Sequence, residues 1–137
     1  AAIDYSNLAV LMVSEIPFSQ WSPMLVLIGS GLLCLVLSTF MSNSATAAMM
    51  IPLIGIVAFA MRDLFIPFGG ASVVIIGVAL SASLAMSLPI STPPNAIAYS
   101  KGFIKQRDMV VVGLFVGIVG FILSYLWLVF AGRVGII

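Results

Sequence analysis

Two short polar clusters stand in otherwise apolar stretches of this 137-residue chain. The first covers residues 38–48 and carries five hydroxyl side chains, among them that of Thr46, and the amide of Asn43. The second, residues 91–95, carries two hydroxyls and one amide around two prolines. Hydroxyl and amide groups form hydrogen bonds and supply neutral oxygen ligands to hard cations. A lipid core offers them no water, so polar residues at that depth predict a functional site.

The composition assigns the chain to the integral membrane class. Hydrophobic residues make up 63% of it and charged residues only 7%, whereas soluble domains carry about 25% charged residues. Charge-free runs cover residues 16–61, 64–100 and 109–132, and each is long enough for a membrane span of about 20 residues. The net charge of +1 gives no reason to expect a nucleic-acid partner.

The residue types that support catalysis or metal binding are scarce. The chain has no histidine, no cluster of acidic residues and a single cysteine, Cys34, in an apolar run. This inventory excludes an internal disulfide and disfavours a transition-metal site. We therefore expect neither an enzyme nor an organic cofactor.

The positions of charges, prolines and glycines predict an all-α membrane protein. Polar residues mark the N-terminal stretch, and three prolines within six residues interrupt an apolar run before the basic residues begin. The expected elements are an interfacial helix and connection (1–20), a helical hairpin (21–61) with its tip at 42–44, an external loop (62–70), a discontinuous helix (71–105) broken at 89–95, and a final transmembrane helix (108–133).

The hairpin allows two interpretations. Residues 21–61 form either two full spans joined by a very short loop or a re-entrant hairpin that turns inside the membrane. Length does not separate them, because either arm would measure about 25–28 Å at 1.5 Å per residue. The uncharged tip at 42–44 favours re-entry.

Basic residues predict the orientation. Lys101, Lys105 and Arg107 lie on one short connection, which the positive-inside rule places in the cytoplasm. The C-terminus, one crossing later, is then outside, as is the 62–70 loop, and the hairpin enters from the outside.

Two interrupted helices would supply the chemistry. A helix N-terminus presents N–H groups and a positive dipole end to an anion, whereas unwound carbonyls suit a cation. No lysine or arginine occurs in the charge-free runs 16–61 and 64–100 that hold the two clusters, so bound cations would have to neutralise the anion, which would make co-transport obligatory. The alternative is that residues 42–44 only form hydrogen bonds between helices and that Pro93 and Pro94 only kink a helix. Two such clusters in one short chain favour the site.

The two clusters resemble the signatures of a known family. Residues 42–48, followed by Ile51 and Pro52, are similar to the Ser-Asn-Thr signature of the divalent anion/sodium symporters, with Ser44 in place of threonine. Residues 88–97 resemble the second signature of that family. Its members carry di- and tricarboxylates or sulfate.

The resemblance implies an elevator-type transporter with two inverted repeats, of which this chain is the second, in the C-terminal half. It implies a substrate site and a Na⁺ site, and Asn43 takes part in both. The substrate residues would be Ser42, Asn43, Ser44, Thr92 and Pro93, and the Na⁺ residues Ser38, Met41 through its carbonyl, Asn43, and Ser91 through its carbonyl.

The expected function is therefore Na⁺-coupled symport of a divalent anion such as a C4-dicarboxylate, with citrate or sulfate as further candidates. The expected partners are the lipid membrane, the N-terminal half of the same transporter and a second copy in a homodimer, with a bacterial inner membrane as the location. Two alternatives stay open: a relative that couples to H⁺ or exchanges anions, and a structural membrane subunit with no site of its own.

Overall fold

The computed structural model describes residues 21–137, and this part of the chain is helical without any strand. The all-α prediction is confirmed for these residues, whereas the interfacial helix expected at 1–20 lies outside them. The elements, in chain order, are α2 (Pro23–Phe40), α3 (Asn43–Ala60), α4 (Arg62–Phe65), the 3₁₀ turn η2 (Ile66–Phe68), α5 (Ser72–Ser83), α6 (Pro93–Ser100) and α7 (Gln106–Val134).

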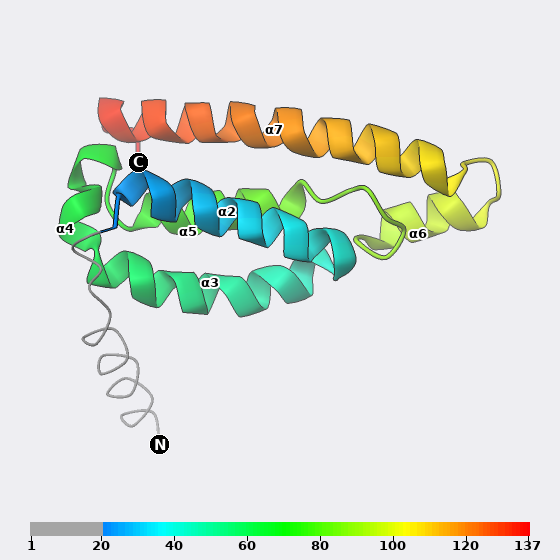
Figure 1. Ribbon diagram of the computed structural model, residues 1–137, viewed down its shortest axis with the longest axis horizontal. Coiled ribbons are helices and arrows are strands. Elements are labelled where there is room, and N and C mark those ends of the chain that lie inside the picture. Colours follow the sequence, from blue (N-terminus) through cyan, green and yellow to red (C-terminus); the bar gives the residue numbers. More distant parts are fainter. Residues whose placement is uncertain (1–20) are drawn as a thin grey trace, which may run out of the picture.

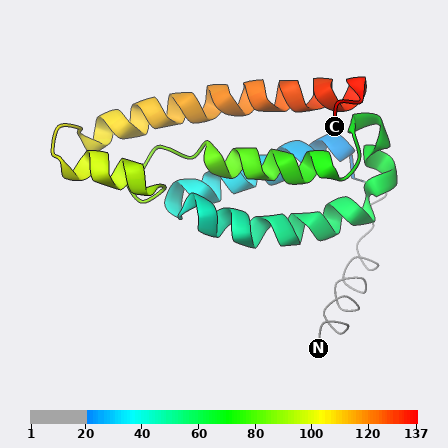
Figure 2. The ribbon, with the colours of Figure 1, turned by 180° about the vertical axis from the view of Figure 1, so that it is seen from behind.

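Helices α2 and α3 form the predicted hairpin, and α5 packs against both of them. The two arms run antiparallel in Figure 1, and Figure 2 shows α5 from behind, between α3 and α7. Each arm has 18 residues, about 27 Å of helix. The turn is shorter than expected: only Met41 and Ser42 are non-helical, both extended, and Asn43 already begins α3.

The 62–70 segment, expected as a loop, is folded. Helix α4 and η2 run to Gly69 and Gly70, whose φ angles of 96° and 80° are readily adopted only by glycine. Phe65 is fully buried in the main core with Val73. Because this aromatic ring is buried, the segment caps the helical bundle at the end opposite the hairpin tip (Figure 1).

The break after α5 begins earlier than the sequence indicates. Helix α5 ends at Ser83 and α6 begins at Pro93, so residues 84–92 are non-helical, rather than 89–95. Pro89 keeps the helix from continuing through this segment, because its ring would clash with the carbonyl four residues before it and it has no N–H to donate. Pro93 and Pro94 start the next helix instead of ending the last one, since proline suits the first helical turn.

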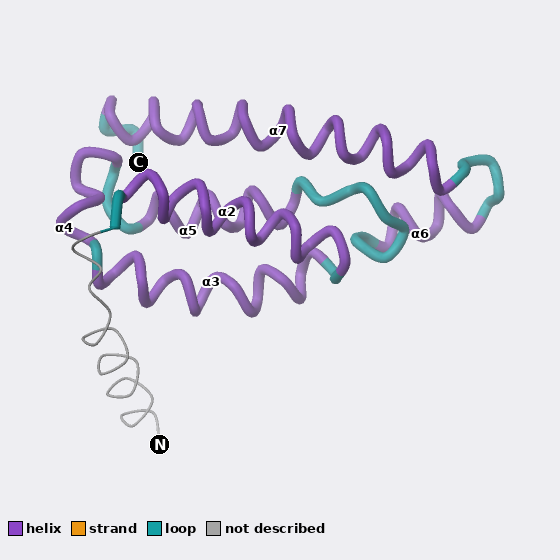
Figure 3. Tube along the Cα trace, viewed as in Figure 1, coloured by secondary structure: helices purple, strands orange, loops and turns teal. Residues whose placement is uncertain are grey.

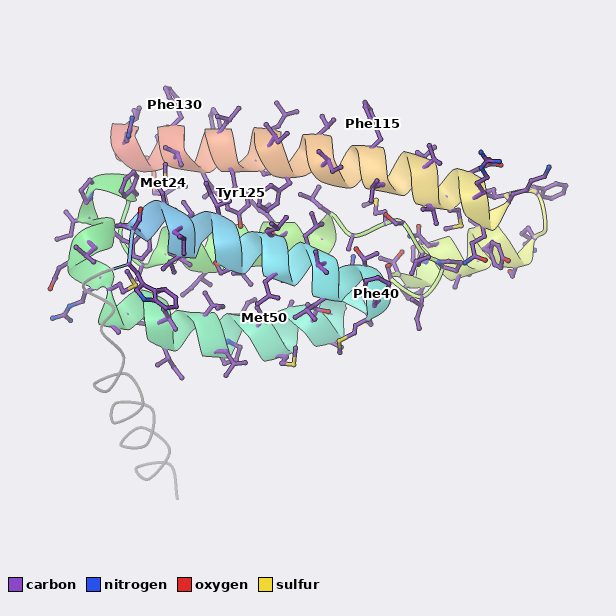
Figure 4. All side chains as sticks on the ribbon, viewed as in Figure 1. Met24, Phe40, Met50, Phe115, Tyr125 and Phe130 are labelled. Carbon is purple, nitrogen blue, oxygen red and sulfur yellow. The ribbon has the colours of Figure 1, made fainter. Side chains whose placement is uncertain are left out.

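Helix α7 runs the length of the molecule over 29 residues, slightly longer than the predicted 108–133. Phe115 and Phe130 point away from the bundle, whereas Tyr125 points towards α2 (Figure 4). Helices α2, α3 and α7 are each long and apolar enough to cross a membrane. Their outward apolar side chains suit contact with lipid or with further protein.

Candidate functional site

The hairpin tip and the broken segment meet, although they lie about fifty residues apart in sequence. The Asn43 backbone N–H donates to the Ser91 carbonyl over 3.1 Å, and the Ser91 hydroxyl donates to the Thr39 carbonyl over 3.3 Å. Figure 3 shows the break as a loop that passes the end of α2. Ser91 is 1% exposed, so the junction is an internal contact.

Three oxygen atoms cluster at this junction. The Ser38 Oγ lies 2.8 Å from the Asn43 Oδ1 and 2.9 Å from the Ala82 carbonyl oxygen. A hydroxyl has one proton, so it donates to only one of these acceptors at a time. If Ser38 donates to Ala82, then Ser38 Oγ and Asn43 Oδ1 stand side by side with no proton between them, unless the Asn43 amide is turned to donate its N–H.

Such a pair of oxygens suits a cation. Hard cations are bound by hydroxyl, amide and carbonyl oxygens, and two oxygens at this spacing with no proton between them can form one edge of a coordination shell. Of the residues predicted for Na⁺, Ser38, Asn43 and Ser91 are joined by the contacts above. Met41 lies in the two-residue turn between them. Nothing in the sequence pointed to the Ala82 carbonyl, because it is presented only by the packing of α5 on α2.

The two helix N-termini differ in what they offer an anion. In α3 the N–H groups of Ser44 and Ala45 have no partner among the described residues, and the Ser42 side chain does not cap the helix. These free donors lie at the positive end of the helix dipole. The hydroxyls of Ser42 and Ser44 belong to exposed residues beside them.

Helix α6 has no free donor in its first turn. Pro93 and Pro94 lack an N–H, the Asn95 N–H is accepted by the Thr92 hydroxyl over 3.4 Å, and the Ala96 N–H is accepted by the Thr92 carbonyl. The structure therefore contradicts the expectation of free backbone donors at α6. At α3 the N–H groups are free, and their binding to an anion stays a prediction. The Thr92 hydroxyl keeps its proton, so this side chain is still able to donate a hydrogen bond.

Glycines of α7 allow the broken segment to lie close against that helix. A Cβ atom at Gly113 would come within 2.5 Å of the Ser87 Cα and 2.7 Å of the Met86 carbonyl oxygen, and one at Gly117 would meet the Leu84 carbonyl oxygen at 3.4 Å. Asn95 adds a tie from α6, because its side-chain N–H donates to the Met86 carbonyl over 3.3 Å. Helices α6 and α7 thus fix the path of the break.

Comparison with known proteins identifies the family. Residues 5–136 match the family model described as "Sodium:sulfate symporter transmembrane region". The chain belongs to the sodium:sulfate symporter family. The resemblance stated from residues 42–48 and 88–97 is thereby confirmed.

Curated relatives agree with this membership. The chain is 39% identical over 83 residues to an uncharacterized transporter of Haemophilus influenzae, covering 61% of this chain and 17% of the relative. It is 36% identical over 108 residues to the sodium-dependent low-affinity dicarboxylate transporter 1 of Caenorhabditis elegans (75% and 18%). It is 40% identical over 81 residues to the Na(+)/citrate cotransporter of Rattus norvegicus (58% and 13%). The chain spans less than a fifth of the length of these three relatives.

Proposed function

We propose that this chain is the C-terminal portion of a Na⁺-coupled symporter for a divalent anion such as a C4-dicarboxylate. The observation that carries the proposal is the oxygen cluster of Ser38, Asn43 and Ala82 beside the uncapped N-terminus of α3. It pairs a set of cation ligands with a set of anion donors. Family membership and the printed names of the Caenorhabditis elegans and rat relatives support the choice of substrate class.

In this proposal the cation is held by Ser38 and Asn43 through their side chains and by Met41 and Ser91 through their carbonyls. The anion is held by Ser42, Asn43 and Ser44 at the first turn of α3, and by Thr92 beside Pro93. No lysine or arginine occurs in residues 64–100 or 16–61. The bound Na⁺ therefore supplies the positive charge that the anion needs, and neither ligand binds well alone.

The remaining architecture is part of the same proposal. The α2–α3 hairpin is re-entrant and enters from outside, and the chain is the second inverted repeat of an elevator-type transporter. The N-terminal half supplies the rest of the site and the protein is a homodimer. The protein lies in a bacterial inner membrane with residues 101–107 in the cytoplasm and the C-terminus outside.

The test uses the full-length protein that contains this segment, reconstituted in proteoliposomes. We expect succinate uptake that requires an inward Na⁺ gradient and falls at least about tenfold in Asn43→Ala and Thr92→Ala, because each change removes a proposed ligand. Arg62→Gln is the control, since this side chain is exposed at the other end of the hairpin.

Other outcomes identify the alternatives. Uptake that persists without Na⁺ and collapses with the pH gradient would assign the protein to H⁺ coupling. Loading with internal anion that replaces the Na⁺ requirement would indicate exchange. Absence of uptake for dicarboxylates, citrate and sulfate, with the protein folded, would leave the structural-subunit interpretation.

A further inference from the structure

A buried hydroxyl near the hairpin tip has no hydrogen-bond partner. Thr46 is completely buried, and its Oγ1 makes no hydrogen bond with the described residues. Among residues 21–137, it is the only buried side-chain nitrogen or oxygen atom without a hydrogen-bond partner. Buried polar groups are normally paired, so this exception needs an explanation, and a bound ion or water is one.

The Thr46 hydroxyl does not make the hydrogen bond within its own helix that is usual for threonine. A threonine hydroxyl in a helix commonly donates to the carbonyl three or four residues earlier, as Thr39 does to Leu35 over 2.9 Å. For Thr46 the carbonyl four residues back belongs to Ser42, and it accepts the Thr46 backbone N–H over 2.9 Å. The Oγ1 atom makes no bond of its own to that carbonyl.

Thr46 shares a helix face with Asn43. Residues three apart on a helix are neighbours on its surface, and Thr46 begins the line of buried α3 residues that continues with Met50 and Ala58. This line faces the interior, where α3 packs on α5. The oxygen cluster of Ser38, Asn43 and Ala82 lies at the same end of that interface.

We propose that the Thr46 hydroxyl oxygen is a further ligand of the cation bound by Ser38 and Asn43. The assignment rests on the proposed function and adds a residue to its cation site. The oxygen cluster includes Asn43, one helical turn before Thr46, and its three oxygens share the single Ser38 hydroxyl proton, so it favours a positive ion over an anion. A neutral hydroxyl ligand helps to strip water from Na⁺ without adding a charge that would oppose the anionic substrate.

The proposal predicts different behaviour for two substitutions at one position. Thr46→Val keeps the shape and removes the oxygen, whereas Thr46→Ser keeps the oxygen and removes a methyl group. Without Na⁺, Thr46→Val should be at least as heat-stable as the wild type, because it removes an unpaired buried polar group. With Na⁺, Thr46→Val should gain less stability than the wild type gains.

The experiment is a NaCl titration of the purified full-length protein, with choline chloride keeping the ionic strength constant, read by thermal unfolding and by Na⁺ activation of uptake. We expect Thr46→Val to raise the Na⁺ midpoint by about tenfold or more in both readouts, and Thr46→Ser to stay within about twofold of the wild type. Ser30→Ala is the control, because it removes another buried hydroxyl, one that donates to the Leu27 carbonyl within its own helix.

The experiment distinguishes an error in the Thr46 assignment from an error in the proposed Na⁺-coupled function. If Thr46→Val is stabilised by Na⁺ as much as the wild type, Thr46 is only an unpaired hydroxyl or a water ligand, and the assignment is wrong while Na⁺ coupling stands. If the wild type itself does not respond to Na⁺, the proposed function is wrong and this assignment falls with it.

Discussion

Replacing Gly113 by alanine should damage the site from a distance, because at this glycine α7 lies against the backbone of the broken segment. The new Cβ would lie 2.5 Å from the Ser87 Cα and 2.7 Å from the Met86 carbonyl carbon. Ordinary carbon contacts are about 3.5–4.0 Å. The neighbouring atoms are backbone, so the segment has to move by about 1 Å, since no side chain can rotate away.

The magnitude follows from the contact that this movement would break. Ser91 lies four residues after Ser87, and its carbonyl accepts the Asn43 N–H over 3.1 Å. A shift of about 0.5 Å at Ser91 lengthens this bond beyond the range of an effective hydrogen bond. Loss of one such bond costs about 0.5–1.5 kcal/mol, which corresponds to an up to about tenfold weaker apparent affinity for Na⁺.

The assay is Na⁺-dependent uptake by the full-length protein, together with thermal unfolding with and without Na⁺. Gly120→Ala is the first control, because its Cβ meets only the Leu84 side chain, at 2.6 Å, and that side chain can change rotamer. Gly55→Ala is the second, since nothing lies within 4 Å of its Cβ among the described residues. We expect both controls to keep the wild-type Na⁺ midpoint. A Gly113→Ala protein with the same midpoint as these controls would refute the idea that α7 fixes the break.

Two further substitutions test the frame around the site. Tyr125→Phe removes a hydroxyl that lies 3.0 Å from the Ser81 Oγ. We expect this protein to lose about 1 kcal/mol of stability and to keep the wild-type Na⁺ midpoint. A large change in that midpoint would contradict a purely structural role for Tyr125. Gly69→Ala places a side chain at a φ of 96°, within 2.9 Å of the Ile137 carbonyl oxygen, and should lower the unfolding temperature by an amount equivalent to about 1–2 kcal/mol. Gly70→Ala has a similar φ but open space around it, so we expect it to lose less stability than Gly69→Ala. A larger loss of stability at Gly70 would show that the contact of Gly69 with Ile137 is unimportant.

Much of this protein could be predicted from its sequence. The helical membrane class follows from apolar runs without charge, because only backbone that is hydrogen-bonded within itself crosses lipid. The two interruptions follow from local chemistry: a polar cluster at residues 42–44 and three prolines between 89 and 94. The family could be identified from the same residues, since its signatures are short and contiguous.

The tertiary structure decided where the interruptions begin and what they contact. The turn shrinks to Met41 and Ser42, and the break starts at residue 84, because helix ends depend on which carbonyls the neighbouring elements satisfy. The Ala82 carbonyl joins Ser38 across 44 positions only because α5 packs on the hairpin. No local pattern encodes that pairing.

The two polar clusters were thus visible in the sequence as anomalies of composition, while their unequal roles were not. From the sequence alone, the N-termini of α3 and α6 were both predicted to bind an anion. The two prolines remove the first two donors of α6 already in the sequence, and the fold shows that Thr92 accepts the next two N–H groups, whereas α3 keeps two free N–H groups. Composition determines which groups are buried in the apolar region, and packing determines which of them remain unpaired and available to a ligand.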